Sequence, residues 1–322
     1  MKAIRVRRPG GPEVLRLEEI PEPGVGPGEV LVRLEAIGIN FIEIYQREGL
    51  YPTPTPYTPG REGAGVVVAV GPGVTRVELG DRVASESFKG SYAEYASIGE
   101  ERVVVLPPAI DTRTAAGMML QGLTAHYLAT STHPLAVGET CLVHAAAGGV
   151  GLLLCQIATQ RGAAVIGTTS TEAKAALARE AGAKDVILYA EGDFAAEVRR
   201  LTGGSGVQVV YDSVGKTTFD ASLDCLAPLG MLVLYGQSSG PVPPFDPQTL
   251  NRKGSLFLTR PTLAHYVATP EALADRARDL LAWVQKGTLR VRVDHTFPLA
   301  GAEAAHRALA SRTTTGKALL LP

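Results

Sequence analysis

Residues 139–161 (ETCLVHAAAGGVGLLLCQIATQR) constrain the fold of this chain more than any other segment. Residues 140–145 form the short apolar run that is typical of a buried parallel strand. Residues 152–159 continue as an apolar segment without proline, which is typical of a helix. Because a glycine-rich turn at 146–151 joins the two, the sequence predicts a strand, a tight turn and a helix.

The turn itself matches the pattern that holds the pyrophosphate of a dinucleotide. That pattern uses one small residue for the tight turn, one where backbone approaches the phosphates and one where helix meets strand. Here the three places are Ala146, Gly148 and Gly151. With no side chain at Gly148, the amides that open the helix can point at an anion, and the helix dipole adds to the attraction. A glycine turn can also be purely structural, but the flanking strand and helix supply the context that the motif requires.

Alternating strands and helices surround this turn. The expected strands after it are residues 163–167, 185–188, 207–211, 231–235 and 255–259. The expected helices are 115–130, 171–181, 193–201 and 219–226. This alternation predicts an α/β fold with a doubly wound parallel sheet of the Rossmann type.

Both ends of the chain have a different pattern. Short strands between Gly and Pro residues, at 1–6, 29–37, 66–70, 81–84 and 103–106, indicate a small antiparallel barrel. The tail adds expected helices at 271–285 and 302–310, and expected strands at 291–296 and 317–321. Since 322 residues exceed what one core usually spans, we expect two domains. Residues 1–117 and 263–322 would form one, with the nucleotide domain 118–262 inserted between them.

Composition excludes several classes of function. The net charge of −1 gives no basic surface for nucleic acid, and the apolar runs are too short for a membrane span or a signal peptide. Cys141, Cys155 and Cys225 are scattered through apolar segments. We therefore expect them to be core residues of a cytoplasmic protein, and neither disulfide partners nor metal ligands.

Three motifs carry a family resemblance. They are GINFIEIYQREGLYP at 38–52, TPGREGAGVV at 58–67, and the cofactor turn with Gly138-Glu139 and Leu142 before it and Gln156 after it. Over nearly its whole length the chain resembles the zinc-independent quinone oxidoreductases of the medium-chain dehydrogenase/reductase superfamily, the zeta-crystallin-like branch. Thr159 departs from the family, whose members more often carry a basic residue or Ser there. The resemblance implies a GroES-like barrel as the catalytic domain, NADPH as cofactor and a quinone as substrate.

The zinc-dependent relatives hold their metal with a Cys, a His and a second Cys or acidic residue. Asn40 stands where they have the Cys, and Arg61, followed by Glu62, stands where they have the His. A guanidinium stays protonated and cannot ligate zinc, and no Cys precedes residue 141 to build their four-Cys structural lobe. We therefore expect no zinc, and an internal ion pair between Arg61 and Glu62.

The segment beyond the turn bears on the choice of nicotinamide. An NAD-specific site places an acidic residue about twenty residues further on, at the ribose hydroxyls. Residues 168–171 (TTST) stand there instead. Ser170 and Lys174 can donate to a 2′-phosphate, with Glu172 between them pointing outward, although Lys174 could equally be a solvated helix lysine. The absent acid favours NADPH, and the resemblance adds Tyr189 near that phosphate.

The candidate substrate-side residues are Asn40, Tyr45, Tyr51 and Thr124. By resemblance, Asn40 and Tyr51 line the cleft beside the nicotinamide, where an amide and a phenol can hydrogen-bond an acceptor oxygen. The alternatives are polar packing at a strand end for Asn40 and ordinary core packing for the others. Hydride transfer to a quinone needs little acid–base machinery, because a proton can come from solvent or a nearby hydroxyl.

Further cofactor contacts are expected at the turn, at the strand ends and at family positions. Residues 236–240 follow the fifth strand at the carboxyl edge and resemble the family's nicotinamide-side loop. Lys317 matches a family position that reaches the cofactor, but a surface lysine would look the same. The expected set is Asn40, Tyr51, Thr124, Ala147, Gly148, Gly149, Val150, Gly151, Gly167, Thr168, Ser170, Lys174, Tyr189, Ser213, Gly236, Ser238, Ser239, Phe257, Leu258, Thr259 and Lys317. We expect His126, His144, His265 and His306 to be structural.

Two other functions stay open at this point. The same scaffold could reduce activated carbon–carbon double bonds in enones or alkenals, because a fold does not fix a substrate. Relatives also serve as lens crystallins or bind RNA, so a non-catalytic NADPH-binding protein is a second alternative, although the balanced charge argues against nucleic acid. The family forms dimers or tetramers through the nucleotide domain, and residues 255–259 are the expected edge strand for such pairing.

Overall fold

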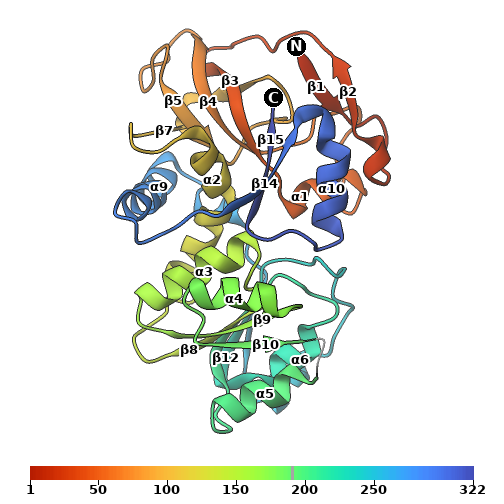
Figure 1. Cartoon of the computed structure of the whole chain (residues 1–322), viewed down its shortest axis with the longest axis vertical. Coiled ribbons are helices and arrows are strands. Elements are labelled where there is room, and N and C mark those ends of the chain that lie inside the picture. Colours follow the sequence, from red (N-terminus) through yellow and green to blue (C-terminus); the bar gives the residue numbers. More distant parts are fainter. Residues whose placement is uncertain (190–191) are drawn as a thin grey trace. The chain divides into compact units, whose positions relative to one another are not determined.

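The structure is a computed structural model that describes residues 1–189 and 192–322. The chain forms two compact units (Figure 1). Unit 1 comprises residues 1–123 and 268–322, and unit 2 comprises residues 124–267. The sequence placed these boundaries at 117/118 and 262/263. Within the described chain, none of the helices combines the length and apolarity needed to cross a membrane.

Unit 1, which is described throughout, is built on a seven-stranded sheet with the order β14-β15-β3-β4-β5-β7, in which β6 also pairs with β3. All pairs are antiparallel except β14 with β15. Leu319 lies opposite Gly38, so the two ends of the chain build one sheet. Its strands are β3 (Glu29–Gly38), β4 (Glu62–Val70), β5 (Arg82–Ser85), β6 (Tyr95–Gly99), β7 (Val104–Val105), β14 (Val293–Pro298) and β15 (Lys317–Leu321). The pair β1 (Lys2–Arg5) and β2 (Arg16–Glu19) lies apart from that sheet.

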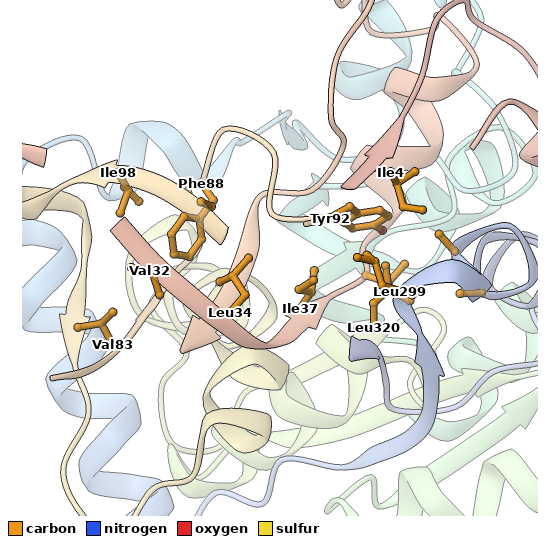
Figure 2. Close-up of a cluster of buried hydrophobic side chains, with 14 of the residues drawn as sticks. Ile4, Val32, Leu34, Ile37, Val83, Phe88, Tyr92, Ile98, Leu299 and Leu320 are labelled. Carbon is orange, nitrogen blue, oxygen red and sulfur yellow. The ribbon is translucent and has the colours of Figure 1, made fainter. Parts of the chain in front are cut away.

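The helices of unit 1 come from both ends of the chain as well. They are α1 (Phe41–Arg47), α2 (Thr112–Tyr127), which continues into unit 2, α9 (Pro270–Gln285) and α10 (Ala302–Ala310). Figure 2 shows the core, in which Leu299 and Leu320 from the C-terminal segment lie beside Ile37 and Tyr92. Burying each such side chain contributes roughly 1.5–3 kcal/mol, so this cluster joins the two segments.

In the described part of unit 2, six parallel strands follow the order β10-β9-β8-β11-β12-β13. The doubly wound sheet predicted from the sequence is therefore confirmed. The strands are β8 (Thr140–Val143), β9 (Ala164–Thr169), β10 (Asp185–Leu188), β11 (Val207–Asp212), β12 (Leu226–Leu234) and β13 (Phe257–Thr259). Leu142 and Val210 are cross-strand neighbours between Ile166 and Leu232, which gives one apolar row across the sheet.

Helices cover both faces of this sheet. Figure 1 shows α3 (Gly149–Gln160) and α4 (Glu172–Glu180) on one side, and α5 (Phe194–Leu201) and α6 (Phe219–Asp224) on the other. Two short helices, α7 (Gln248–Arg252) and α8 (Leu263–Tyr266), complete the unit. Cys141, Cys155 and Cys225 are buried free thiols, as expected. Burial raises the pKa of Cys155 and of Cys225 to about 12, so both stay protonated and serve as packing groups.

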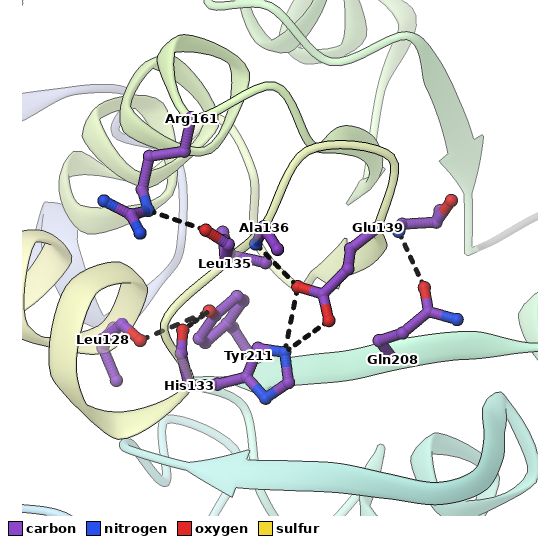
Figure 3. A network of polar contacts seen from close by, with 9 residues as sticks. Leu128, His133, Leu135, Ala136, Glu139, Arg161, Gln208 and Tyr211 are labelled. Carbon is purple, nitrogen blue, oxygen red and sulfur yellow. Dashed lines mark hydrogen bonds and ion pairs between the residues drawn. The ribbon is translucent and has the colours of Figure 1, made fainter.

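Polar contacts fix the amino-terminal edge of the sheet (Figure 3). The Glu139 carboxylate accepts a hydrogen bond from the Ala136 amide at 2.9 Å and lies 3.2 Å from Nε2 of His133. The Tyr211 hydroxyl donates to the carbonyl of Leu128 at 3.3 Å, and Arg161 donates to the carbonyl of Leu135 at 2.9 Å. The start of β8 is therefore anchored at the edge opposite to the glycine turn.

Three sequence predictions need correction. The segment that begins at Asn40 was not predicted as a helix, yet it contains α1. The expected helix 219–226 ends at Asp224, because Leu226 already begins β12, which is longer than the expected strand 231–235. The expected strand 255–259 begins only at Phe257, since Ser255 has a φ of 56° and cannot be extended.

Candidate active site

The glycine turn forms a narrow cradle at the start of α3. Gly148 is the N-cap residue, and among the described residues no side chain caps this helix. The first amides of a helix have no intrahelical partner, so they are free to bind an anion, which the helix dipole also attracts. A Cβ at Gly151 would lie 2.4 Å from the carbonyl oxygen of Ala145, and one at Gly167 would lie 2.8 Å from Cβ of Ala146. Both positions therefore require glycine for packing.

A buried polar network supports the cradle from below. His144 immediately precedes the turn, and its Nδ1 lies 2.9 Å from the Thr168 hydroxyl while its Nε2 lies 3.0 Å from the Ser222 hydroxyl. Ser222 also contacts Asp212, at 3.3 Å. Burial lowers the pKa of His144, so the ring is neutral and structural, as expected. Thr168 is buried and its hydroxyl contacts the His144 ring, so its side chain helps to hold the turn.

The residues expected at the 2′-phosphate lie along the neighbouring ends of β9 and β10. Thr169 of β9 is opposite Leu188, so Ser170 and Tyr189 follow adjacent strand ends, and Tyr189 is 43% exposed. Thr171 caps α4 by accepting a hydrogen bond from the Lys174 amide, which places Lys174 in the first turn. Glu172 pairs with Arg179 on the exposed side of α4. This strand end therefore carries the hydroxyl of Ser170 and, in the first turn of α4, the cation of Lys174.

The loops after β11 and β12 are joined into one structure. The Ser238 amide donates to the Ser213 carbonyl at 3.1 Å, and the Ser239 amide donates to the Val214 carbonyl at 2.8 Å. A Cβ at Gly236 would lie 2.5 Å from the Ser213 carbonyl oxygen, so only glycine fits there. Because β13 is the parallel neighbour of β12, with Thr259 opposite Val233, its end lies at the same carboxyl edge as these loops.

Unit 1 contains a second polar site, which we call the Asn40 cluster and which comprises Asn40, Glu43, Glu62 and Lys317. Asn40 caps α1 in a capping box with Glu43, whose carboxylate accepts from the backbone nitrogen of Asn40 at 2.7 Å. The Asn40 side chain donates through Nδ2 to Glu62 at 3.0 Å. The Lys317 ammonium donates to Oδ1 of Asn40 at 2.7 Å and to Oε2 of Glu62 at 2.5 Å.

All four side chains of the Asn40 cluster are buried. Burial raises the pKa of Glu43 to about 7, and its Oε1 has no hydrogen-bond partner among the described residues. A Cβ at Gly38 would lie 2.1 Å from Oε2 of Glu62, so glycine is required beside the cluster. The cluster is thus a closely packed set of charges at the end of β3.

One prediction about this region is wrong, and so is one alternative. The alternative of a surface lysine at Lys317 is excluded, because this residue is 1% exposed and its ammonium is bonded to Asn40 and Glu62. The expected Arg61–Glu62 pair does not form, since Oε1 of Glu62 accepts from the Leu120 amide at 2.7 Å and Oε2 accepts from Asn40 and Lys317. Glu43 was missed, although its position three residues after Asn40 is the spacing of a capping box.

The candidate tyrosines lie beside the cluster on α1 and just beyond it. Tyr45 is 9% exposed, and its ring meets that of Tyr51 edge-on with centroids 5.3 Å apart. The Tyr51 amide donates to the Tyr45 carbonyl at 3.1 Å. The structure thus brings Asn40, Tyr45 and Tyr51 onto one helix and its following turn, while Thr124 lies on α2 as the first residue of unit 2.

A metal ion would need several ligand side chains close together. Among residues 1–189 and 192–322, no three His, Cys, Asp or Glu side chains form a group that could hold a metal ion. At the family position of the zinc-binding Cys, Asn40 contacts the ammonium of Lys317. The expectation of no zinc rests on these residue types.

Two family models match adjoining parts of the chain. The alcohol dehydrogenase GroES-like domain matches residues 26–137, and the zinc-binding dehydrogenase family matches residues 149–286. The first region includes β3 to β7 of unit 1, and the second includes β9 to β13 of unit 2 together with α9 of unit 1. The second family is named for zinc binding. That name does not supply ligands, and the described residues of this chain gather no group of three that could hold the metal.

Similar proteins match the chain over its full length. A quinone oxidoreductase of Pseudomonas aeruginosa is 49% identical over 100% of this chain and 99% of its own length. A 2-haloacrylate reductase of a Burkholderia species is 42% identical, over 99% of this chain and 98% of its own. The crystal structure of Escherichia coli quinone oxidoreductase complexed with NADPH is 43% identical, with a TM-score of 0.98 and 100% of both chains covered.

Proposed function

The chain belongs to the zinc-independent quinone oxidoreductases of the medium-chain dehydrogenase/reductase superfamily, and on that premise we propose that it catalyses the NADPH-dependent reduction of quinones. The observation that carries this proposal is the cofactor side of unit 2. An uncapped helix opens at Gly148, and the next strand end offers Ser170 and Lys174 where an NAD site would carry an acid.

The residues of unit 2 fit NADPH by their chemistry. The amides of Ala147, Gly149, Val150 and Gly151 would hold the pyrophosphate, since no side chain of the described residues competes for them at the helix start. The Gly148 amide already donates to the Ala145 carbonyl at 2.8 Å, so Gly148 would contribute the close approach of the backbone to the phosphates. Ser170, Lys174 and Tyr189 would hold the 2′-phosphate through donated hydrogen bonds and one positive charge. When bound, NADPH supplies the hydride, so the protein needs to contribute alignment and exclusion of water.

The nicotinamide end would lie along the carboxyl edge formed by the joined loops and β13. We propose that Gly236, Ser238 and Ser239 contact it together with Ser213, and that Phe257, Leu258 and Thr259 form its last wall. The bonds between the two loops support this proposal, because they hold backbone groups in a fixed arrangement. Asn40 and Tyr51 are proposed to hydrogen-bond the acceptor oxygen, and the reduced product takes its proton from solvent or a hydroxyl.

A second candidate substrate class is activated carbon–carbon double bonds. It is favoured by the 2-haloacrylate reductase at 42% identity, whose name describes reduction of such a bond. The deciding experiment measures NADPH oxidation with 1,4-naphthoquinone and with a short alkenal at matched concentrations. We expect kcat/KM to be higher for the quinone. A higher value for the alkenal would replace the proposed substrate class, and NADPH binding without turnover of either would support a non-catalytic role.

We also propose that the protein is a homodimer or homotetramer formed through unit 2. β13 is an edge strand of the parallel sheet, and Phe257 on it is 55% exposed. An edge strand can pair with its mate across a two-fold axis. Light scattering coupled to size-exclusion chromatography tests this, with a Leu258→Pro variant as the disrupted edge. A cytoplasmic location is proposed as well, because three free buried thiols suit a reducing compartment.

A further inference from the structure

Lys317 is a fully buried cation in unit 1, outside the unit that carries the glycine turn. Burying a charge is costly unless it is paired and hydrogen-bonded. Here Glu62 supplies the opposite charge at 2.5 Å and Asn40 supplies an amide oxygen at 2.7 Å. Lys317 is the first residue of β15, near the end of the chain. Asn40 follows β3, and Glu62 is the first residue of β4, so the bonds of Lys317 join the end of the chain to its first third.

These contacts fix the orientation of the Asn40 side chain. Its oxygen faces a cation and its nitrogen faces a carboxylate, so the reversed orientation of the amide would place like partial charges together. The amide nitrogen carries two hydrogens, and Glu62 accepts one of them. The second hydrogen forms no bond in unit 1, which the structure describes throughout.

A cation on the amide oxygen also changes the amide chemically. It draws electron density from the nitrogen, so the remaining N–H becomes a stronger hydrogen-bond donor, as expected for polarised chains of hydrogen bonds in a low-dielectric interior. A donor of this kind is most useful where negative charge develops during a reaction. A quinone oxygen gains such charge when its ring accepts a hydride, and a solvent proton then completes the hydroquinone while NADP⁺ is left as the oxidised product.

We propose that Lys317 is a positioning residue, which holds and polarises the Asn40 amide so that its second N–H donates to the oxygen of the acceptor. The proposal rests on the proposed quinone reduction and assigns Lys317 to the acceptor side. Its ammonium acts through Asn40 and does not contact the cofactor. The family position had pointed to the cofactor, whereas the bonds in unit 1 point to Asn40.

The amide can be observed directly, because the chain has only two asparagines, Asn40 and Asn251. Selective ¹⁵N labelling of asparagine side chains gives two NH₂ signals, and Asn251→Ser assigns them. In Lys317→Met we expect the Asn40 signal to move and the Asn251 signal to stay. Lys253→Met is the matched control, since Lys253 pairs with Asp224 on the surface of unit 2 and its loss should leave the Asn40 signal unchanged.

Steady-state kinetics of the variants separate a loss of the positioning role of Lys317 from a loss of the fold. Lys317→Met leaves Glu62 buried without its cation, so Lys317→Met/Glu62→Gln, which removes both charges, keeps the fold testable. We expect kcat with a quinone to fall about tenfold or more in both variants while the KM for NADPH stays within about twofold, and Lys317→Arg to recover part of kcat. A folded double variant with wild-type kcat, or an Asn40 signal unmoved by loss of Lys317, would overturn the proposal.

The labelled spectra and the kinetics also distinguish a failure of the proposed quinone reduction from a failure of the role proposed for Lys317. If the wild-type protein reduced no quinone, the proposed function would fail, whereas the labelled spectra would still report whether Lys317 holds the Asn40 amide. If the quinone were reduced and the spectra did not respond to Lys317→Met, only the role of Lys317 would be wrong.

Discussion

The ammonium of Lys317 lies 2.5 Å from Oε2 of Glu62, and both side chains are buried in unit 1. Glu62 begins β4 and Lys317 begins β15, so this ion pair closes the same sheet that Leu319 and Gly38 join by strand pairing. Buried pairs of this kind are weak sources of net stability but strongly disfavour the loss of one partner. Their value here is the fixed orientation of the Asn40 amide.

The cradle gives a pair of glycine variants with opposite expectations. A Cβ at Gly151 would lie 2.4 Å from a backbone oxygen, so Gly151→Ala should lower the free energy of unfolding by roughly 1–3 kcal/mol. A Cβ at Gly148 would lie 3.2 Å from the Ala145 carbonyl oxygen, and its φ of −78° suits any residue. Gly148→Ala should therefore fold and bind NADPH about tenfold more weakly, because its methyl enters the phosphate site. Thermal unfolding and fluorescence titration with NADPH check both. Unchanged NADPH affinity in a folded Gly148→Ala would place the pyrophosphate elsewhere.

Lys174 tests the choice of nicotinamide. Lys174→Ala should raise the KM for NADPH about tenfold and leave the KM for NADH within about twofold, because only NADPH carries the 2′-phosphate. Lys184→Ala serves as the control, since Lys184 precedes β10 at the opposite edge of the sheet. An equal rise in the KM for NADPH and for NADH would show that Lys174 does not bind the 2′-phosphate.

Glu43 gives a pH dependence of stability. Burial raises the pKa of its carboxyl to about 7 from the ordinary 4.5, so the unfolded chain releases this proton at lower pH than the folded one. The free energy of unfolding should therefore fall as pH rises from about 4.5 to 7. In Glu43→Gln this decline should shrink, by at most about 3 kcal/mol. Urea unfolding between pH 5 and 8 measures it, with Glu22→Gln on an exposed loop as control. An identical pH slope in Glu43→Gln and wild type would mean that the group is ionised throughout.

His306 gives a pH dependence of stability in the acidic range. Its ring lies 3.2 Å from the Arg47 guanidinium and 3.0 Å from the Tyr92 hydroxyl. Burial, together with Arg47, lowers the pKa of His306 to about 3, so the unfolded chain takes up a proton as pH falls below about 6.5 while the folded chain does not. Stability is then lost as pH falls from about 6.5 towards 3. His306→Gln should show a shallower loss between pH 6.5 and 4 than wild type, and exposed His265→Gln should match wild type. A slope as steep in His306→Gln as in wild type would assign the loss to other groups.

The parallel sheet was well predicted because each of its strands and helices is indicated by consecutive residues. The apolar run before the turn, the glycines and the apolar helix after it are consecutive, and each reports its own structure. The turn predicted that Gly151 must be small, as the short distance there shows. Strand and helix ends were less well predicted where a single backbone angle decides them, as at Ser255 with its positive φ.

The Asn40 cluster could not be predicted in the same way. Lys317 is 277 positions from Asn40, and no periodicity links residues so far apart. Helix α1 is short and buries Glu43 and Arg47 beside Ile44 and Tyr45, so its polar and apolar residues do not separate onto two faces. The capping-box spacing between Asn40 and Glu43 was the one available signal for that helix. Topology alone brings Lys317 to it.

The most direct test of the central claim is the initial rate of NADPH oxidation with 1,4-naphthoquinone after exhaustive dialysis against a zinc chelator. We expect the same rate before and after dialysis, no gain on adding Zn²⁺, and slower oxidation of NADH than of NADPH. A rate that disappears with the chelator and returns with Zn²⁺ would contradict an acceptor site built from an amide and a lysine ammonium.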